Sequence, residues 1–174
     1  EDGAPLPLSA RSSSKLFKGG KVSLEFGESM ILEPLQIVNH ENIMKRQGQF
    51  PVIHIDLKNT KGSSYDEILS KFQIELHNTF LGHRYLSKST KLKKSGEDEV
   101  LERYINPKMC RELTPGDLSQ GLSLLSKFLH THFDKKAFVL MDEYDAAINH
   151  SYIKFSSTES ERVISFFRDI NETR

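Results

Sequence analysis

A short apolar run of strand length, residues 51–57, is the first firm element that the hydrophobic pattern predicts. It is rich in β-branched residues and it alternates, so Ile53 and Ile55 face one way while His54 and Asp56 face the other. Its leading proline suits the first position of a strand, where no ladder hydrogen bond is lost. The strand face that carries His54 and Asp56 thus becomes polar toward the carboxyl end of the strand, which is where α/β sheets place ligands.

Three further stretches repeat apolar residues at steps of three and four, which predicts amphipathic helices. One covers about residues 64–85, and the other two follow Thr114 and Ser156. Asp117 and Glu159 stand three positions after those two hydroxyl residues, as in a capping box. The sequence thus marks the starts of the last two helices as well as their buried stripes.

An unbroken apolar run, residues 137–141, has the length of a strand and separates the last two helices. Such a run is typical of a central parallel strand that is covered on both faces. The order strand, helix, helix, strand, helix predicts an α/β fold. Because the two strands need crossover connections, we expect them to be parallel, as neighbours or next but one, in a P-loop-like three-layer sandwich with a mostly parallel sheet.

The remaining segments give the expected domain organisation. Residues 1–14 are rich in Pro, Ser and Gly and predict a flexible arm or linker, whereas residues 15–174 form a partial domain. Within it, residues 16–49 carry mixed signals for short extended pieces. Residues 87–112 carry charged clusters without sustained periodicity, which predicts a surface insertion with a short helix over residues 100–105. The chain starts without Met and stops close behind a helical pattern, as expected for a segment of a larger multidomain protein.

The composition is that of one ordinary folded domain, with 174 residues of which 37% are hydrophobic and 28% charged. Basic and acidic residues number 24 each, so the overall charge attracts neither nucleic acid nor an anionic membrane. Cys110 is the single cysteine, which excludes an internal disulfide and fits a reducing compartment. No apolar run reaches the length of about 18 residues that a membrane-spanning helix needs. We therefore expect a cytoplasmic protein.

Candidate chemistry gathers at the exit of the second strand, where Asp142 and Glu143 follow the apolar run. Nucleotide hydrolases use such a pair: the first acid holds Mg²⁺, usually through water, and the second polarises the attacking water. Asp142 is then the metal-side acid and Glu143 the general base, while Asp145 completes an acidic cluster. Asp56 could border the same site from the neighbouring strand. Acids also end many strands without any function, so solvated strand ends remain an alternative for these residues.

A resemblance strengthens the functional reading of this block. Residues 138–152, with the sequence Asp-Glu-Tyr-Asp at 142–145, resemble the Walker B block of the predicted AAA-ATPase-like family, bacterial P-loop proteins often fused to a PD-(D/E)XK-type nuclease domain. Residues 16–19, and residues 50–57 with the helix after them, are similar to other parts of that family. The resemblance implies Mg and ATP as cofactors of the intact parent and a fused effector domain, such as a nuclease, as partner. It also implies a bacterial cytoplasm, or a host cytosol for a secreted effector.

Two positions depart from the family pattern. Ala147 stands where the family usually has Pro, which should loosen the turn but removes no ligand. The pair Gly20-Lys21 is followed by Val22, and Lys15 stands where the leading glycine of a Walker A loop should be. The phosphate-binding loop is therefore expected upstream of Glu1, and this chain alone is expected to bind ATP poorly.

Two rival functions stay open. A degenerate, non-hydrolysing ATPase-like fold could serve as a scaffold for a protein partner. Less favoured is nucleic-acid binding through the lysines of residues 88–94, because acids follow them at once and no aromatic residues interleave.

Overall fold

The computed structural model describes residues 14–23 and 28–172. Its contacts divide the chain into two compact units at Phe50 and Pro51, and each unit is described by itself. The predicted arm, residues 1–14, lies outside the described residues except for Ser14, which starts a short helix.

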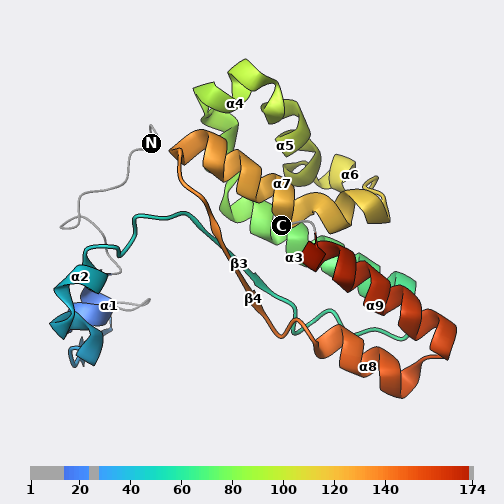
Figure 1. Ribbon diagram of the computed structural model, residues 1–174, viewed down its shortest axis with the longest axis horizontal. Helices are drawn as coiled ribbons and strands as arrows, with labels where there is room; N and C mark the ends of the chain where they lie inside the picture. The colour runs from blue at the N-terminus through green and yellow to red at the C-terminus, as the bar shows by residue number, and fades with distance from the viewer. Residues whose placement is uncertain (1–13, 24–27, 173–174) are drawn as a thin grey trace. The chain divides into compact units, whose positions relative to one another are not determined.

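The smaller unit contains an antiparallel pair of short strands and three helical turns (Figure 1). The strands confirm the short extended pieces that the mixed signals predicted, and Gly20 pairs with Leu32 at their open end. Gly19 joins the first helix to the first strand at a φ of 77°, and a Cβ there would lie 2.7 Å from the Leu32 carbonyl oxygen. Only glycine fits this turn without a shift of the backbone. The elements are α1 (Ser14–Lys18), β1 (Gly20–Ser23), β2 (Ser29–Leu32), η3 (Gln36–Asn39) and α2 (Glu41–Met44).

The larger unit, residues 51–172 of the described chain, is built on two parallel strands, β3 (Val52–Asp56) and β4 (Phe138–Asp142). They are direct neighbours, which confirms the parallel pairing that the sequence predicted. Backbone hydrogen bonds extend the ladder at both ends: the Phe138 N–H donates to the Pro51 carbonyl, and the Leu57 N–H donates to the Asp142 carbonyl, each at 3.0 Å. The pairing therefore reaches the acidic exit of β4.

Helices make up the rest of the larger unit, and those that the sequence marked begin as expected. The Ser64 hydroxyl accepts a hydrogen bond from the Glu67 N–H at the first of them, and Thr114 and Asp117 form a complete capping box at the second. The helices are α3 (Tyr65–Gly82), η4 (Arg84–Lys88), α4 (Thr90–Ser95), α5 (Glu97–Ile105), α6 (Pro107–Cys110), α7 (Pro115–Phe133), α8 (Ala146–Lys154) and α9 (Ser157–Glu172).

Within the described part of the larger unit, helices cover one face of the strand pair and leave the other exposed. Ile53 and Ile55 are buried under α3 and α7, with α9 packed on those two helices (Figure 1). On the opposite face, Val52, Phe138 and Leu140 are 44%, 55% and 52% exposed. Within the larger unit the structure is thus an α/β fold with a small parallel sheet, and the expected third layer is not seen. The apolar run of β4 predicts a strand that is covered on both faces, but hydrophobicity alone does not supply the element that covers a face.

Residues 87–112 contribute to the core and do not form the surface insertion that the sequence predicted. Leu92, Leu101 and Tyr104 are fully buried. The Tyr104 ring stacks on Phe80 with centroids 4.4 Å apart, and its hydroxyl donates to the Asp117 carbonyl at 2.8 Å. The expected short helix over residues 100–105 is confirmed as part of α5. The other helices here have only four to six residues, which is too short for a periodic stripe to show in the sequence.

Two other features complete the fold. The sequence did not predict helix α8, directly after the acidic block, since it has only nine residues and two of its apolar residues, Tyr152 and Ile153, are exposed. None of the helices in the described residues is long and apolar enough to cross a bilayer.

Candidate functional site

The site begins with two acids that the strand register places side by side. Asp56 is the last residue of β3, Asp142 is the last residue of β4, and the two are partners in the parallel ladder. Neighbouring strands lie about 4.8 Å apart. Both side chains are exposed and lie on the uncovered face, as does His54, two residues before Asp56. The shared strand face of His54 and Asp56 agrees with the sequence analysis, and the register adds Asp142 to it.

Backbone amides hold both carboxylates in place. Oδ1 of Asp56 accepts a hydrogen bond from the Lys58 N–H at 2.9 Å, and Oδ1 of Asp142 accepts one from the Glu143 N–H at 3.0 Å. Such local bonds orient an acid at a strand end without consuming its second oxygen. Each acid therefore retains acceptor capacity toward solvent or a hydrated cation.

Glu143 lies in the turn that leads from β4 into α8, and its backbone is left-handed with a φ of 53°. This conformation costs a residue with a side chain roughly 1–2 kcal/mol. The turn closes when the Ala146 N–H donates to the Glu143 carbonyl at 3.0 Å. Strained backbone conformations that glycine would relieve are found most often at functional sites. The conformation of Glu143 therefore supports its candidacy in addition to its position in the sequence.

Asp145 precedes α8 and does not cap it through its side chain. Instead its Oδ2 accepts a hydrogen bond from the Asn149 amide at 2.9 Å, one turn along the helix. Ala147, where the resemblance implies Pro, is the second residue of α8 and is buried. The first turn of α8 therefore forms with Ala147 in place of proline.

Among the described residues, no three His, Cys, Asp or Glu side chains come together as a metal-binding group. The structure thus pairs Asp56 with Asp142 but assembles no closed cage with Glu143 and Asp145. Mg²⁺ does not require one, because it keeps several waters and binds through one or two carboxylates together with substrate phosphates. The exposed Asp56 and Asp142 carboxylates fit that requirement, and they could hold a hydrated Mg²⁺.

A long-range hydrogen bond joins the segments that follow the two strands, and no pattern in the sequence predicts it. The His150 Nε2–H donates to the Gly62 carbonyl at 2.9 Å, which ties the loop after β3 to α8. The two residues are 88 positions apart, and a lone histidine on a short helix carries no recognisable pattern. His150 therefore joins the two segments that follow the strands ending in Asp56 and Asp142.

The same loop is held at the start of α3. The Ser63 N–H and hydroxyl both donate to Oε2 of Glu67 at 2.7 Å, and Lys71 forms an ion pair with Glu67 at 2.8 Å. The hydrogen bond from Lys71 and those from Ser63 lower the pKa of Glu67 to about 2. The loop after β3 is therefore fixed both to α3 and to α8.

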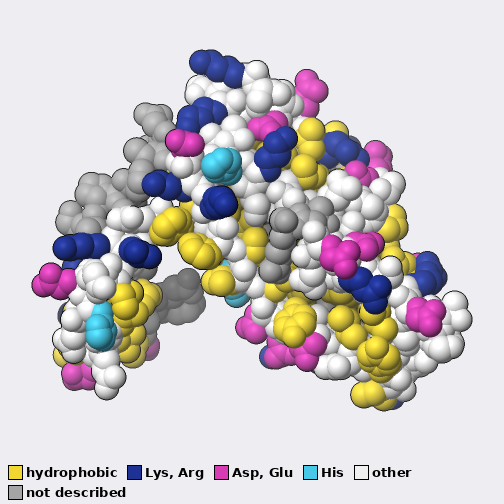
Figure 2. Space-filling model, in the orientation of Figure 1, with side chains coloured by type: hydrophobic (Ala, Val, Ile, Leu, Met, Phe, Trp, Pro, Cys, Tyr) yellow, Lys and Arg dark blue, Asp and Glu magenta, His cyan; other side chains and the backbone are white. Residues whose placement is uncertain are grey.

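The surface around the site combines acidic and apolar groups. Figure 2 shows acidic side chains gathered where β4 ends, next to hydrophobic side chains over α8. Tyr144 is exposed within the acidic block, and Ile153 on α8 is 78% exposed. Large exposed apolar side chains beside a polar site are typical of a surface that contacts another molecule.

The fold and the site are those of an α/β protein with a pair of acids at the carboxyl edge of two parallel strands. A strained acidic residue lies in the turn after the second strand. The chain belongs to the predicted AAA-ATPase family, whose model matches residues 23–173. That match covers both strands of the larger unit and the whole acidic block, and it confirms the resemblance found in the sequence. Neither curated proteins nor solved structures gave a match.

Proposed function

We propose that this chain carries the Walker B part of an AAA-like P-loop NTPase module within a larger protein. The observation that supports it is the register of Asp56 with Asp142 at the carboxyl edge of two parallel strands, with Glu143 in the following turn. Parallel α/β sheets bind ligands at this edge. Membership of the predicted AAA-ATPase family points to nucleoside triphosphate as the ligand.

Each acid has a separate task in this proposal. Asp142 holds a hydrated Mg²⁺ through its free oxygen, while Asp56 and Asp145 flank the nucleotide site. Glu143 orients the attacking water and accepts its proton, which requires the carboxylate form. The bound Mg²⁺ supplies neutralisation of the charge that develops on the phosphate oxygens.

Hydrolysis would be coupled to an attached effector domain, such as a nuclease. Two features favour transmission through the turn and α8. The Glu143 turn leads directly into α8, and His150 on that helix is bonded to the loop after β3. A change in the metal or nucleotide bound at Asp142 would therefore affect both α8 and the loop after β3.

The test uses the full-length protein with Mg-ATP. Glu143→Gln should slow turnover by about 10²–10⁴-fold, the usual effect of losing a general base, while nucleotide binding is kept. Asp142→Ala should weaken Mg-dependent binding as well as turnover. Glu161→Gln, an exposed glutamate on α9, is the matched control and should leave both unchanged. Full turnover in the Glu143→Gln variant refutes the assignment of the base.

The alternative function is a non-hydrolysing ATPase-like scaffold for a protein partner. It is favoured by the exposed Val52 and Leu140 on one face of the sheet, which offer apolar surface without requiring chemistry. The same experiment separates the two functions. If neither Asp142→Ala nor Glu143→Gln changes any measurable interaction with nucleotide, the acids are strand-end residues and the scaffold is the better description.

A further inference from the structure

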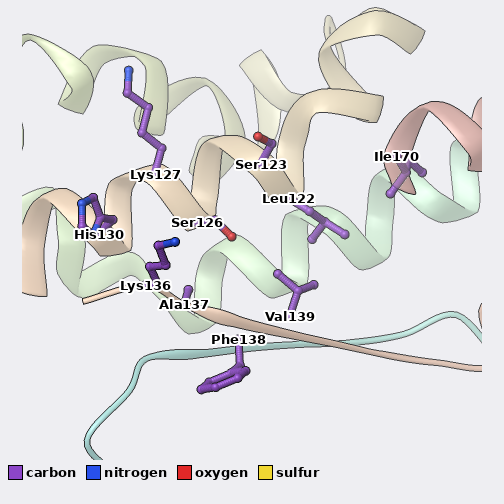
Figure 3. Close-up of a pocket in the computed structure, with 10 residues that line it drawn as sticks. All are labelled: Leu122, Ser123, Ser126, Lys127, His130, Lys136, Ala137, Phe138, Val139 and Ile170. Atoms are coloured by element: carbon purple, nitrogen blue, oxygen red, sulfur yellow. The ribbon is translucent and has the colours of Figure 1, made fainter. Parts of the chain in front are cut away.

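A cavity of about 540 Å³ lies beside the first half of β4, away from the acids at the strand's end (Figure 3). Its walls come from α7, from the start of β4 and from the last turns of α9. Sites for small molecules usually have volumes of roughly 300–1,000 Å³ and apolar walls with a few polar groups. The size and the position of this cavity therefore suit a ligand other than the nucleotide of the proposed function.

One stripe of α7 gives the cavity a gradient from apolar to polar. Leu122, Ser126 and His130 are spaced four residues apart and line the same wall. Leu122 is buried, Ser126 is half-buried and His130 is exposed. The wall thus becomes more polar and more open along the helix, from Leu122 to His130.

The inner end of the cavity is apolar. Leu122 and Ile170 are nearly fully buried, and Val139 of β4 points up toward them (Figure 3). Phe138, the preceding residue, projects from the other side of the strand in the same view. This end offers aliphatic contacts and no charged group.

The outer end of the cavity is cationic. Lys136 extends beneath α7 toward the side of Ser126, and His130 lies on the helix above it (Figure 3). Lys136 forms no ion pair with any residue that the structure describes. Lys127 also borders the cavity, but its ammonium turns away and pairs with Glu97 at 2.9 Å. Among the described residues that line the cavity, Lys136 is therefore the cation available to a ligand, with the Ser126 hydroxyl and the His130 imidazole on the same side.

We propose that this cavity binds a small amphipathic carboxylate, with its head group at Lys136 and its aliphatic chain against Leu122, Val139 and Ile170. A single lysine matches one negative charge, whereas a phosphate dianion is usually met by arginine or by several donors. The apolar end provides the burial that an alkyl chain of several carbons requires. Charge and shape therefore favour a medium-chain carboxylate.

The experiment titrates the full chain with octanoate and, separately, with the uncharged octanol and with octyl phosphate. We expect octanoate to bind saturably and more tightly than octanol or octyl phosphate. Lys136→Met weakens octanoate binding at least about tenfold, because a charge-assisted hydrogen bond is lost. Lys135→Met is the matched control, since Lys135 is the adjacent exposed lysine and does not line the cavity. It leaves the affinity unchanged.

Several results overturn the proposal. Octanol binding as tightly as octanoate would show that the cation plays no part, and tighter binding of octyl phosphate would assign the cavity to phosphates. Equal losses in the Lys136 and Lys135 variants would show a diffuse charge effect. If octanoate does not bind and Lys136→Met instead changes the sedimentation coefficient, a second copy of the chain covers the cavity. None of these results bears on Mg-ATP turnover, which tests the proposed function independently.

Discussion

Asp56 and Asp142 are partners in the register of two parallel strands, although 85 residues separate them in the sequence. Their side chains lie on one exposed face, and each has one oxygen fixed by a nearby backbone amide. Two like charges at this separation are unfavourable in the absence of a cation. The arrangement is therefore expected to be sensitive to salt and to divalent metal.

Replacing one acid of this pair should make the chain more stable at low salt. Asp56→Asn keeps an acceptor for the Lys58 N–H but removes a charge opposite Asp142, so the free energy of unfolding should rise by roughly 0.2–1 kcal/mol. The gain should shrink at 1 M salt, where charges are screened within about 3 Å. Urea unfolding at both salt concentrations measures it. A gain that does not change with salt would contradict the electrostatic origin.

Magnesium should also stabilise the folded chain, because it neutralises the charge of the Asp56 and Asp142 pair. Millimolar Mg²⁺ should stabilise the unsubstituted chain at low salt more than it stabilises the Asp56→Asn variant, because a ligand that binds the folded state raises stability. Thermal unfolding with Mg²⁺, and with Na⁺ at equal ionic strength, separates binding from screening. Equal effects of the two salts would show that the acids do not hold the metal.

Glu143→Gly should separate strain from function at the turn after β4. Glycine adopts the φ of 53° without the steric cost that glutamate bears, and this outweighs its larger loss of backbone entropy. The free energy of unfolding should rise by about 0.5–1 kcal/mol, while nucleotide turnover in the full-length protein should fall as it does in Glu143→Gln. Chemical denaturation and an ATPase assay give the two readings. A variant that is less stable would indicate that the glutamate side chain supports the fold.

Residues 1–174 by themselves should show no ATP hydrolysis above background. They contain no Gly-Lys-Ser/Thr sequence, and without its amides and lysine the acids of the site have little with which to hold the β- and γ-phosphates. Calorimetric titration with Mg-ATP checks the prediction. A micromolar dissociation constant for this chain would contradict it.

Glu67 should make the stability of the larger unit depend on pH in the acid range. Its folded pKa of about 2 lies below its ordinary value of 4.5, so its contribution is complete above pH 4.5 and is lost as the pH falls toward 2. Glu67→Gln should therefore reduce stability at pH 6 and lose that difference near pH 2. Urea unfolding of both chains between pH 2 and 6 gives the comparison. A difference that is constant over this range would contradict the pKa.

The pattern of apolar residues determined the larger part of the fold. Strand and helix periodicities depend on local backbone geometry, so β3, β4, α3, α7 and α9 could be located from the sequence. The capping residues Thr114 and Ser156 marked the starts of two of these helices. The Asp-Glu pair at the end of β4 could be recognised in the same way, because a strand's last residue and the residue that follows it are contiguous. The family could be identified for the same reason.

The tertiary structure decided what depends on residues that are far apart in the sequence. The ladder register placed Asp56 beside Asp142, and packing of short helices buried Leu92 and Leu101, because such contacts are set by shape and not by local period. Only the structure showed that one sheet face within the larger unit is exposed and that Lys136 and His130 line the same cavity. Apolar character indicates that a residue favours burial, but the packing of the whole chain determines which element buries it.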